Sequence, residues 1–300
     1  MTDLPVPPAP PGAWERVKLA RHPERPHTLA YLDALASRWV ELHGDRSFGD
    51  DRALIGGLAT IGGRTVMILG HQKGNDTKEN IARNFGMARP EGYRKAERLL
   101  RHAEKFGFPV VAFIDTPGAE PGIGSEERGQ GTAIAECLLT MADLGTPTIA
   151  VVIGEGGSGG ALAIGVADRI LMLENAIYAV ASPEACAAIL WKDAGRAAEA
   201  AETMRITASD LLRFGIVDEI IPEPRPAHLD PEATLHATGE AIARHLRELT
   251  NQYPLTDPGT VDRLRTARYE RFRRIGAWSE TSPGGNGLVS ESIALATTRE

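Results

Sequence analysis

Two hydrophobic patterns alternate along the first 220 residues of the chain: short β-branched runs and longer amphipathic runs. The short runs, bounded by Gly and Pro, predict strands over residues 53–61, 65–70, 109–114, 148–153, 169–173, 177–180 and 217–221. Apolar residues at helical spacing predict helices over residues 28–43, 91–106, 133–144, 161–167 and 199–214. Gly62-Gly63 is typical of a hairpin turn between the first two strands. Strands that alternate with helices predict an α/β domain with helices packed on a sheet.

The two ends of the chain differ in composition from this central region. Residues 5–11 are rich in proline, so residues 1–20 are expected to form a disordered lead-in. Residues 21–250 are expected to form the main domain. Residues 251–300 are then a partly disordered C-terminal extension, and its last residues, 281–300, are expected to be loosely ordered.

Composition and charge narrow the class of protein. A net charge of −7 argues against nucleic acid as the main partner. Cys137 and Cys186 form no C-x-x-C pair, so we expect no metal in this chain and a reducing compartment. No apolar run reaches membrane-spanning length, and the first residues lack the basic and apolar segments of a secretory leader. The sequence therefore predicts a soluble cytoplasmic protein.

A glycine-rich segment between the strand at 148–153 and the helix at 161–167 predicts an anion site. It reads Gly154-Glu155-Gly156-Gly157-Ser158-Gly159-Gly160. A strand that passes directly into a helix leaves backbone N–H groups bare at the positive end of the helix dipole. Glycines let a ligand approach those groups closely. We therefore expect Gly156, Gly157 and Ser158 to contact the substrate.

Three kinds of chemistry fit this segment. Gly154-x-Gly156-x-x-Gly159 matches a dinucleotide-binding fingerprint. Gly156-x-Ser158-x-Gly160 matches a nucleophile elbow, in which Ser158 attacks the substrate. In the third interpretation the Gly159 and Gly160 amides form an oxyanion hole and no side chain acts as nucleophile. A tight turn with close packing is the structural alternative.

Residues 21–249 contain a series of long sequence motifs in a fixed order. They are Arg21-His22-Pro23, Gly70-His71-Gln72-Lys73-Gly74, Arg83-Asn84-Phe85-Gly86-Met87, Pro90-Glu91-Gly92-Tyr93, Asp115-Thr116-Pro117-Gly118-Ala119, Glu126-Glu127-Arg128-Gly129-Gln130, the glycine-rich segment, Ser182-Pro183-Glu184 and Ile220-Ile221-Pro222-Glu223-Pro224. Together they resemble the alpha subunits of bacterial acetyl-CoA carboxylase carboxyltransferase, which belong to the crotonase superfamily. A series of ordered words is far more specific than any single motif.

The resemblance implies a crotonase-like fold built from repeated ββα units. It also implies transfer of a carboxyl group from N-carboxybiotin, held on a biotin carboxyl carrier protein, to acetyl-CoA, which gives malonyl-CoA. The family's beta subunit completes the active site and carries a zinc ribbon, so we expect an α2β2 assembly with zinc in the partner. Negative charge develops on an enolate oxygen and on the ureido oxygen of biotin, and fixed backbone donors can hold both charges.

The resemblance assigns candidate roles to two loops. In the family the Gly159 and Gly160 amides lie on the biotin side of the site. Crotonase-like folds place a second oxyanion or substrate loop where residues 115–122 lie, so Gly118 and Ala119 become candidate donors. Gly122 then becomes a candidate substrate contact. The alternative for this loop is a Pro/Gly turn capped by its aspartate.

Three charged residues are candidates with more than one interpretation. Lys73 is a candidate for binding CoA phosphates or the carboxylate in transit. Glu120 departs from the family word, which has tyrosine at this position. Its carboxylate either faces the site, paired with Arg128 or Lys73, and alters the acyl-CoA preference, or it points to solvent. Glu155 either orients the glycine-rich turn by accepting a backbone hydrogen bond or is solvated.

The wider context weakens two interpretations of the glycine-rich segment. A Ser158 hydrolase needs a histidine, and His228, His236 and His245 lie in a polar or helical tail. A dinucleotide fingerprint belongs at the first strand-to-helix turn, whereas several predicted strands precede this one. A carboxyltransferase subunit is therefore favoured. The alternatives are a stand-alone crotonase-type hydratase, isomerase or decarboxylase, and a non-catalytic scaffold subunit.

Overall fold

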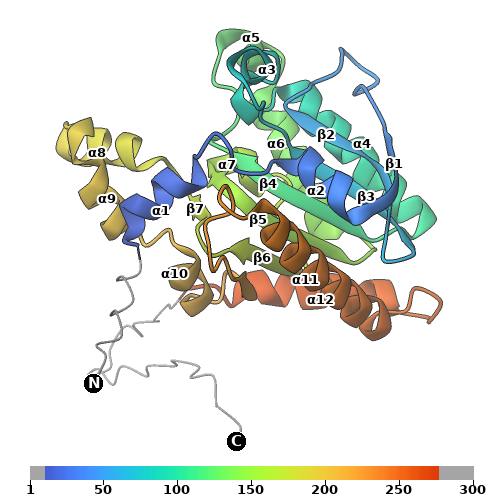
Figure 1. The fold of residues 1–300 in the computed structure, drawn as a ribbon. Coiled ribbons are helices and arrows are strands. Elements are labelled where there is room, and N and C mark those ends of the chain that lie inside the picture. The colour runs from blue at the N-terminus through green and yellow to red at the C-terminus, as the bar shows by residue number, and fades with distance from the viewer. Residues whose placement is uncertain (1–10, 277–300) are drawn as a thin grey trace, which may run out of the picture.

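The computed structural model describes residues 11–276, in which helices cover both faces of a mixed sheet (Figure 1). The strands are β1 (Ala36–Glu41), β2 (Leu54–Ile61), β3 (Arg64–His71), β4 (Val110–Thr116), β5 (Thr148–Gly157), β6 (Arg169–Leu173), β7 (Ile177–Ala179) and β8 (Glu219–Ile221). The α-helices are α1 (Ala13–Ala20), α2 (Thr28–Leu35), α3 (Thr77–Ala82), α4 (Pro90–Phe106), α5 (Ile123–Glu127), α6 (Gln130–Asp143), α7 (Ser158–Leu162), α8 (Pro183–Trp191), α9 (Ala197–Met204), α10 (Ala208–Arg213), α11 (Pro231–Gln252) and α12 (Thr260–Arg273). Short 3₁₀ turns are η1 (Asn84–Gly86) and η2 (Ala194–Arg196).

The sheet runs in the order β1-β2-β3-β4-β5-β6-β8, and β7 pairs with the far end of β5. Strand β2 is antiparallel to both of its neighbours, β1 and β3, and Gly62 and Gly63 turn the β2–β3 hairpin as the sequence predicts. From β3 to β8 the paired strands are parallel, so β3, β4 and β5 end at the same edge of the sheet. This shared edge positions the candidate site.

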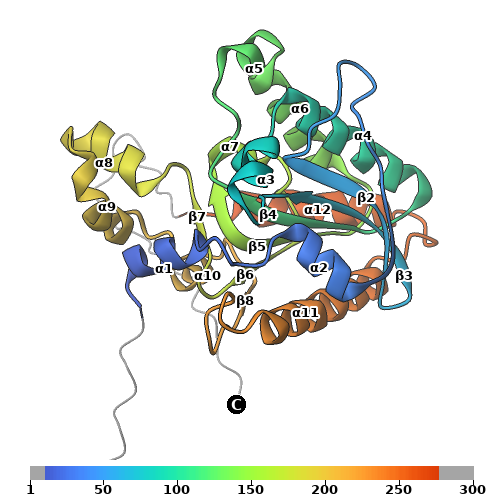
Figure 2. The same cartoon turned by 45° about the horizontal axis from the view of Figure 1, so that its top comes forward.

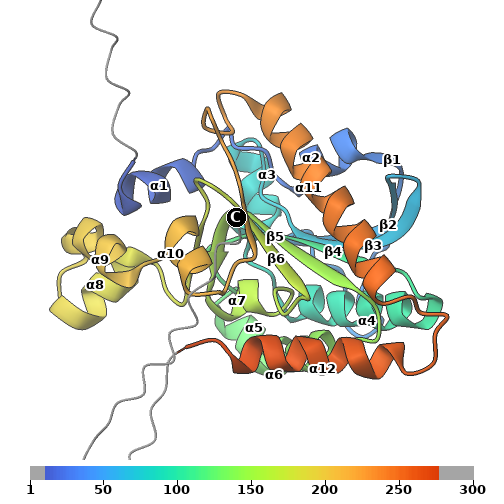
Figure 3. The same ribbon diagram turned by 90° about the horizontal axis from the view of Figure 1, so that it is seen from below.

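Helices form one layer on each face of the sheet. Helices α2 and α11 lie on one face, whereas α4, α6 and α12 lie on the other (Figure 3). Every residue of β4 is buried, as is β5 up to Gly156, because helices cover both faces of these central strands. The core therefore encloses β4 and β5 almost to their carboxyl ends.

Helices α8, α9 and α1 form a small lobe beside the sheet (Figures 1 and 2). Apolar residues of α1 and α9 pack with β7 and Ile206 in a second hydrophobic cluster. The predicted disordered lead-in is therefore wrong for residues 13–20, which form α1 because Val17 and Ala20 are buried in that cluster. Residues 5–10 lie outside the described part of the chain.

The predicted helix over residues 28–43 is wrong in its second half. Helix α2 ends at Leu35, and the chain continues as β1, which pairs with β2. A side chain at Gly57 of β2 would overlap the Val40 carbonyl, so this close strand pairing depends on a distant glycine. Helical spacing in the local sequence carries no information about that glycine.

Several further boundaries differ from the prediction, among them those of the glycine-rich segment and of the C-terminal extension. The glycine-rich segment becomes helical at Ser158, and the helix ends at Leu162 rather than at residue 167. Residues 260–273 of the predicted extension form α12, which packs on α6, whereas the expected loose order of residues 281–300 lies outside the described residues. Within residues 11–276, no helix is both long and apolar enough to cross a bilayer.

Candidate active site

The carboxyl ends of β4 and β5 bring the two predicted loops together. Thr116 of β4 pairs with Gly156 of β5, and each strand then turns into its loop. A Cβ atom placed on Gly160 would lie 2.6 Å from the Ala119 nitrogen and 2.7 Å from the Gly118 carbonyl carbon. The loop after β4 and the first turn of α7 are therefore in direct backbone contact.

Three amides at this contact have no acceptor within the described residues. Gly159 and Gly160 lie in the first turn of α7, where N–H groups have no intrahelical acceptor. The Ala119 amide is likewise free, whereas the Gly118 amide donates to Thr116 Oγ1 at 3.1 Å. Of the two donors predicted in this loop, Ala119 is thus the available one. The site presents backbone donors from two loops to one small region.

The glycines of the segment pack against specific neighbours. A side chain at Gly154 would overlap the Asp115 carboxylate, and one at Gly157 would overlap the Pro117 carbonyl. A Cβ atom on Gly156 would lie 2.6 Å from the Tyr178 ring. These contacts explain the dinucleotide-like spacing without a nucleotide. Ser158 is exposed and has a φ of 50°, a left-handed conformation that non-glycine residues rarely adopt.

A buried ionic network lies behind the glycine-rich turn. Lys73 Nζ lies 2.8 Å from Asp115 Oδ1 and 3.0 Å from Glu155 Oε1. His27 Nδ1 lies 2.7 Å from the other Asp115 oxygen, and Arg21 Nε donates to Glu155 Oε2 at 2.6 Å. The two interpretations of Glu155 from the sequence are therefore both wrong. Its carboxylate is neither solvated nor hydrogen-bonded to the backbone of the turn, because it pairs with Lys73 and Arg21.

The network is electrostatically matched. Burial opposes charge on Asp115, but Lys73 and His27 outweigh that cost and hold the pKa of Asp115 well below its usual range. The pKa of Lys73 is raised because the two carboxylates outweigh its desolvation, and that of Arg21 is raised by Glu184 and Glu155. Lys73 is therefore a cation with its carboxylate partners already in place.

Two buried polar side chains at the site are not among the predicted site residues, although the sequence leaves His71 open to interpretation as a structural histidine or a proton shuttle. Both ring nitrogens of His71 and the Tyr93 hydroxyl lack a hydrogen-bond partner in the described part of the chain. Burial lowers the pKa of His71 to about 4, so its ring is neutral at neutral pH. The Tyr93 hydroxyl lies 3.0 Å from a Cβ atom placed on Gly160. Both residues lie in the sequence motifs quoted above, and those motifs were the one signal in the sequence that could have identified them.

Glu120 turns back into its own loop. Its carboxylate accepts hydrogen bonds from the Gly122 amide at 2.9 Å and from the Ser125 hydroxyl. The Arg128 guanidinium instead pairs with Glu91 at 2.5 Å. Glu120 and Gly122 thus shape the segment that leads into α5, and neither predicted cation pairs with Glu120 among the described residues.

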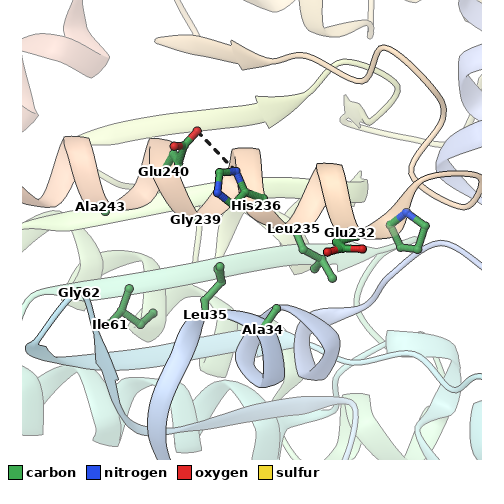
Figure 4. Close-up of a pocket in the computed structure, with 11 residues that line it drawn as sticks. Ala34, Leu35, Ile61, Gly62, Glu232, Leu235, His236, Gly239, Glu240 and Ala243 are labelled. Carbon is green, nitrogen blue, oxygen red and sulfur yellow. Dashed lines mark ion pairs between the residues drawn. The ribbon is translucent and has the colours of Figure 1, made fainter.

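A cleft of about 680 Å³ lies elsewhere, between α2, α11 and the β2–β3 turn (Figure 4). Leu35, Ile61 and Leu235 line it, and His236 Nδ1 lies 3.7 Å from Glu240 Oε2 at its rim. None of the predicted site residues lines this cleft. Over residues 11–276, no group of three or more His, Cys, Asp or Glu side chains is arranged to hold a metal ion.

The sequence is similar to proteins of known family. A family model described as acetyl co-enzyme A carboxylase carboxyltransferase-like matches residues 12–276. The acetyl-coenzyme A carboxylase carboxyl transferase subunit alpha of Acidithiobacillus ferrooxidans is 58% identical over 266 residues, which cover 88% of this chain and 82% of the relative. The subunit of the same name from Synechococcus elongatus is 54% identical over 269 residues, which cover 89% and 80%.

Solved structures support the fold. The transcarboxylase 12S core with bound methylmalonyl-coenzyme A matches with a TM-score of 0.63 and 20% identity, covering 78% of this chain and 44% of that one. A Pseudomonas malonate decarboxylase hetero-tetramer in complex with coenzyme A matches with a TM-score of 0.61 and 22% identity, covering 82% and 97%. These matches confirm the crotonase-like α/β fold. The chain belongs to the acetyl-CoA carboxylase carboxyltransferase-like family.

Proposed function

We propose that this chain is the alpha subunit of a biotin-dependent acetyl-CoA carboxyltransferase. The observation that carries the proposal is the pair of backbone-donor loops at the ends of β4 and β5, with three amides free to bind an anion. The amides of Gly159 and Gly160 stabilise the charge on the ureido oxygen of biotin. The Ala119 amide adds a donor from the neighbouring loop. Removing one such donor typically costs about 10²–10³ in rate.

The reaction breaks the N–CO₂ bond of carboxybiotin and forms a C–C bond to the methyl carbon of acetyl-CoA. The methyl proton moves to the biotin nitrogen that releases the carboxyl group, so malonyl-CoA and biotin are the products. Both the enolate oxygen of acetyl-CoA and the ureido oxygen carry negative charge along this path. Fixed amides that need no reorganisation suit both charges.

The side chains around the turn support a mechanism without a nucleophile. Asp115 and Glu155 are already paired with cations, and His71 is buried. Ser158 is exposed, and the histidine side chains that form hydrogen bonds in the described part of the chain do so with partners other than its hydroxyl. A serine hydrolase would need a histidine hydrogen-bonded to that hydroxyl. The geometry therefore favours backbone donors over Ser158 as the reactive groups.

An apolar face beside the site supports a partner chain. Val180, Ile189 and Leu190, which follow β7 and lie on α8, are 81%, 66% and 61% exposed. They line a hollow of about 400 Å³ whose wall includes Tyr178, the residue that packs on Gly156. The family's beta subunit is the occupant we propose for this face, since exposed apolar patches of this kind mark interfaces. The α2β2 assembly with zinc in the beta subunit, which the family resemblance implies, is part of the same proposal.

The proposal is tested by co-expressing this chain with the carboxyltransferase beta chain of the same organism. Malonyl-CoA formation from acetyl-CoA and carboxylated carrier protein is expected only from the pair, with zinc in the co-purified complex. Leu190→Asp should prevent co-purification, whereas Lys192→Asp on the same lobe should not. Full carboxyl transfer by this chain alone would contradict the two-subunit proposal.

A further inference from the structure

Strand β5 carries a bulge over residues 153–155, where the glycine-rich segment begins. Its pairing with β4 shifts between Ile114 and Thr116: one residue, Asp115, separates the paired residues on β4, whereas residues 153–155 separate Val152 from Gly156 on β5. The extra residues of β5 leave backbone groups that the sheet no longer pairs. A bulge of this kind redirects the chain that follows it, and bulges are frequent beside active sites.

Buried side chains satisfy the backbone of this bulge. Arg25 Nε donates to the Ile153 carbonyl at 2.6 Å, and Asp115 Oδ1 accepts the Glu155 amide at 3.1 Å. The Asp115 oxygen that takes this amide is the same one that contacts Lys73 Nζ at 2.8 Å. Lys73 thus supports the backbone of the bulge through Asp115.

Lys73 also contacts the side chain of Glu155, a residue of the bulge. Its ammonium contacts Glu155 Oε1 at 3.0 Å, so it joins a residue of β4 to a residue of β5. The exposed fractions of the Lys73, Asp115 and Glu155 side chains are 13%, 2% and 10%. Without the ammonium, Asp115 would keep His27 and Glu155 would keep Arg21, but the cation that contacts both buried carboxylates would be lost and their repulsion would rise. The backbone of the bulge would then change conformation, and the glycine-rich turn that follows it would move.

The surrounding backbone leaves space for this arrangement. Gly86, with a φ of 76°, packs against the Lys73 side chain, and a Cβ atom there would lie 3.0 Å from Lys73 Cγ. A side chain at Gly154 would overlap the Asp115 carboxylate. Two glycines in separate segments therefore accommodate one buried cation and its acceptor.

We propose that Lys73 is a positioning residue, which clips β4 to the bulge of β5 and so fixes the direction of the Gly159 and Gly160 amides. This inference rests on the proposed function and reassigns Lys73 from binding a substrate anion. Its ammonium faces the protein on the inner side of the turn. A displacement of the donors by about 1 Å can cost about 10²-fold in rate, because catalysis depends on their position relative to the reacting atoms.

The test uses the complex with the beta subunit and compares Lys73→Met, Lys73→Arg and the exposed control Lys105→Met. Lys73→Met should lower kcat about 10²-fold while KM for acetyl-CoA stays within about threefold. Lys73→Arg should recover at least about tenfold of that loss. Unchanged kcat with a raised KM in Lys73→Met would show a substrate-binding lysine and overturn the proposal, as would kcat within about twofold of wild type.

A double variant separates positioning from a lost substrate contact. Lys73→Met/Glu155→Gln removes one of the two facing carboxylate charges, so it should be more active than Lys73→Met alone. Equal or lower activity of the double variant would contradict the clip. If Lys73→Met does not assemble, the Arg variant and the double variant still decide the question.

Amide hydrogen exchange gives a readout independent of turnover. Peptides covering residues 153–160 should exchange at least about tenfold faster in Lys73→Met than in wild type, with no change in Lys105→Met. If the wild-type complex transfers no carboxyl group, the proposed function fails. The exchange result then confirms or refutes the clip by itself.

Discussion

Buried ion pairs lie at both ends of the central strands. The two ends differ in whether free backbone amides lie beside these pairs. At the carboxyl end, Lys73 joins Asp115 to Glu155. At the amino end, Arg268 of α12 pairs with Asp168, with Nε and Nη2 at 2.8 and 2.9 Å from its oxygens. Asp168 in turn accepts the amide and hydroxyl of Thr148 at the start of β5.

The amino end is a closed set of hydrogen bonds. Arg268 also donates to the carbonyls of Met141, Leu144 and Thr146, so all three of its nitrogens are used. At the carboxyl end the network is equally paired, yet free amides lie directly beside it. From this difference we propose that the amino end contributes mainly to stability and the carboxyl end to the proposed function. Parallel α/β sheets generally place ligands at the carboxyl ends of their strands.

The largest effect is expected at the amino end. Arg268→Met leaves Asp168 buried without its cation, so the free energy of unfolding should fall by about 3–5 kcal/mol. The kcat of the folded complex should stay within about twofold of wild type, because no free amide adjoins this pair. Urea unfolding and steady-state kinetics measure the two quantities, with the exposed Arg273→Met as control. A large loss of kcat at matched folding would break the division between the two ends.

His71 tests the carboxyl end through pH. Its folded pKa of about 4 lies below the unfolded value of 6.5, so the unfolded state binds more protons between these values. Stability should therefore rise with pH across this window and should be lower at pH 4 than at pH 7 by about 3 kcal/mol from His71 alone. Asp115 opposes the lowering and Lys73 adds to it, but burial is the main cause.

Urea unfolding of wild type and His71→Gln at several pH values measures this effect. The variant should lack the His71 part of the pH dependence, whereas His102→Gln, on the outer side of α4, should retain it. Equal slopes for wild type and His71→Gln between pH 4 and 6.5 would contradict a neutral buried imidazole.

Local patterns predicted most of the sheet. The buried run before Asp115, the run that ends at Ile153 and the Gly62-Gly63 hairpin all lie where expected, because burial and turn chemistry are local signals. Strand β1 was missed because its pairing depends on Gly57, which is distant from it in sequence. Helix α12 was missed because a buried arginine anchors a helix of mostly polar residues.

The site was predicted as a list of loops rather than as an arrangement. The glycine-rich turn and the segment after β4 are visible in the sequence, since each is a compact motif. The network behind them was not, because Lys73 follows β3, Asp115 lies in β4 and Glu155 lies in β5, and these segments meet only when the three strands align in parallel. Lys73 meets the two carboxylates only in the folded chain, so the spacing of residues in the sequence cannot predict this contact.

Substitutions at Gly160 test whether the contact between the two donor loops at the carboxyl end is needed for activity. Gly160→Ala places a methyl group 2.6 Å from the Ala119 nitrogen, so the two donor loops must separate, and kcat should fall about 10²-fold. Gly159→Ala meets only the Ile134 side chain, at 3.6 Å, and should lose far less. Ser158→Ala should keep kcat within about twofold. An inactive Ser158→Ala variant beside an active Gly160→Ala variant would instead support the nucleophile interpretation.

The smallest effect is expected at Glu120, which lies at the same end of the sheet but acts within its own loop. Because its carboxylate accepts the Gly122 amide and the Ser125 hydroxyl, Glu120→Gln should weaken these contacts and lower the free energy of unfolding by about 1 kcal/mol. The relative kcat/KM values for acetyl-CoA, propionyl-CoA and butyryl-CoA should not change, since the carboxylate is engaged by its own loop. Glu126→Gln, exposed on α5, is the matched control. A shifted acyl-CoA preference in Glu120→Gln, or in Glu120→Tyr with its loop intact, would place this residue in the acceptor pocket and extend the functional end of the sheet to α5.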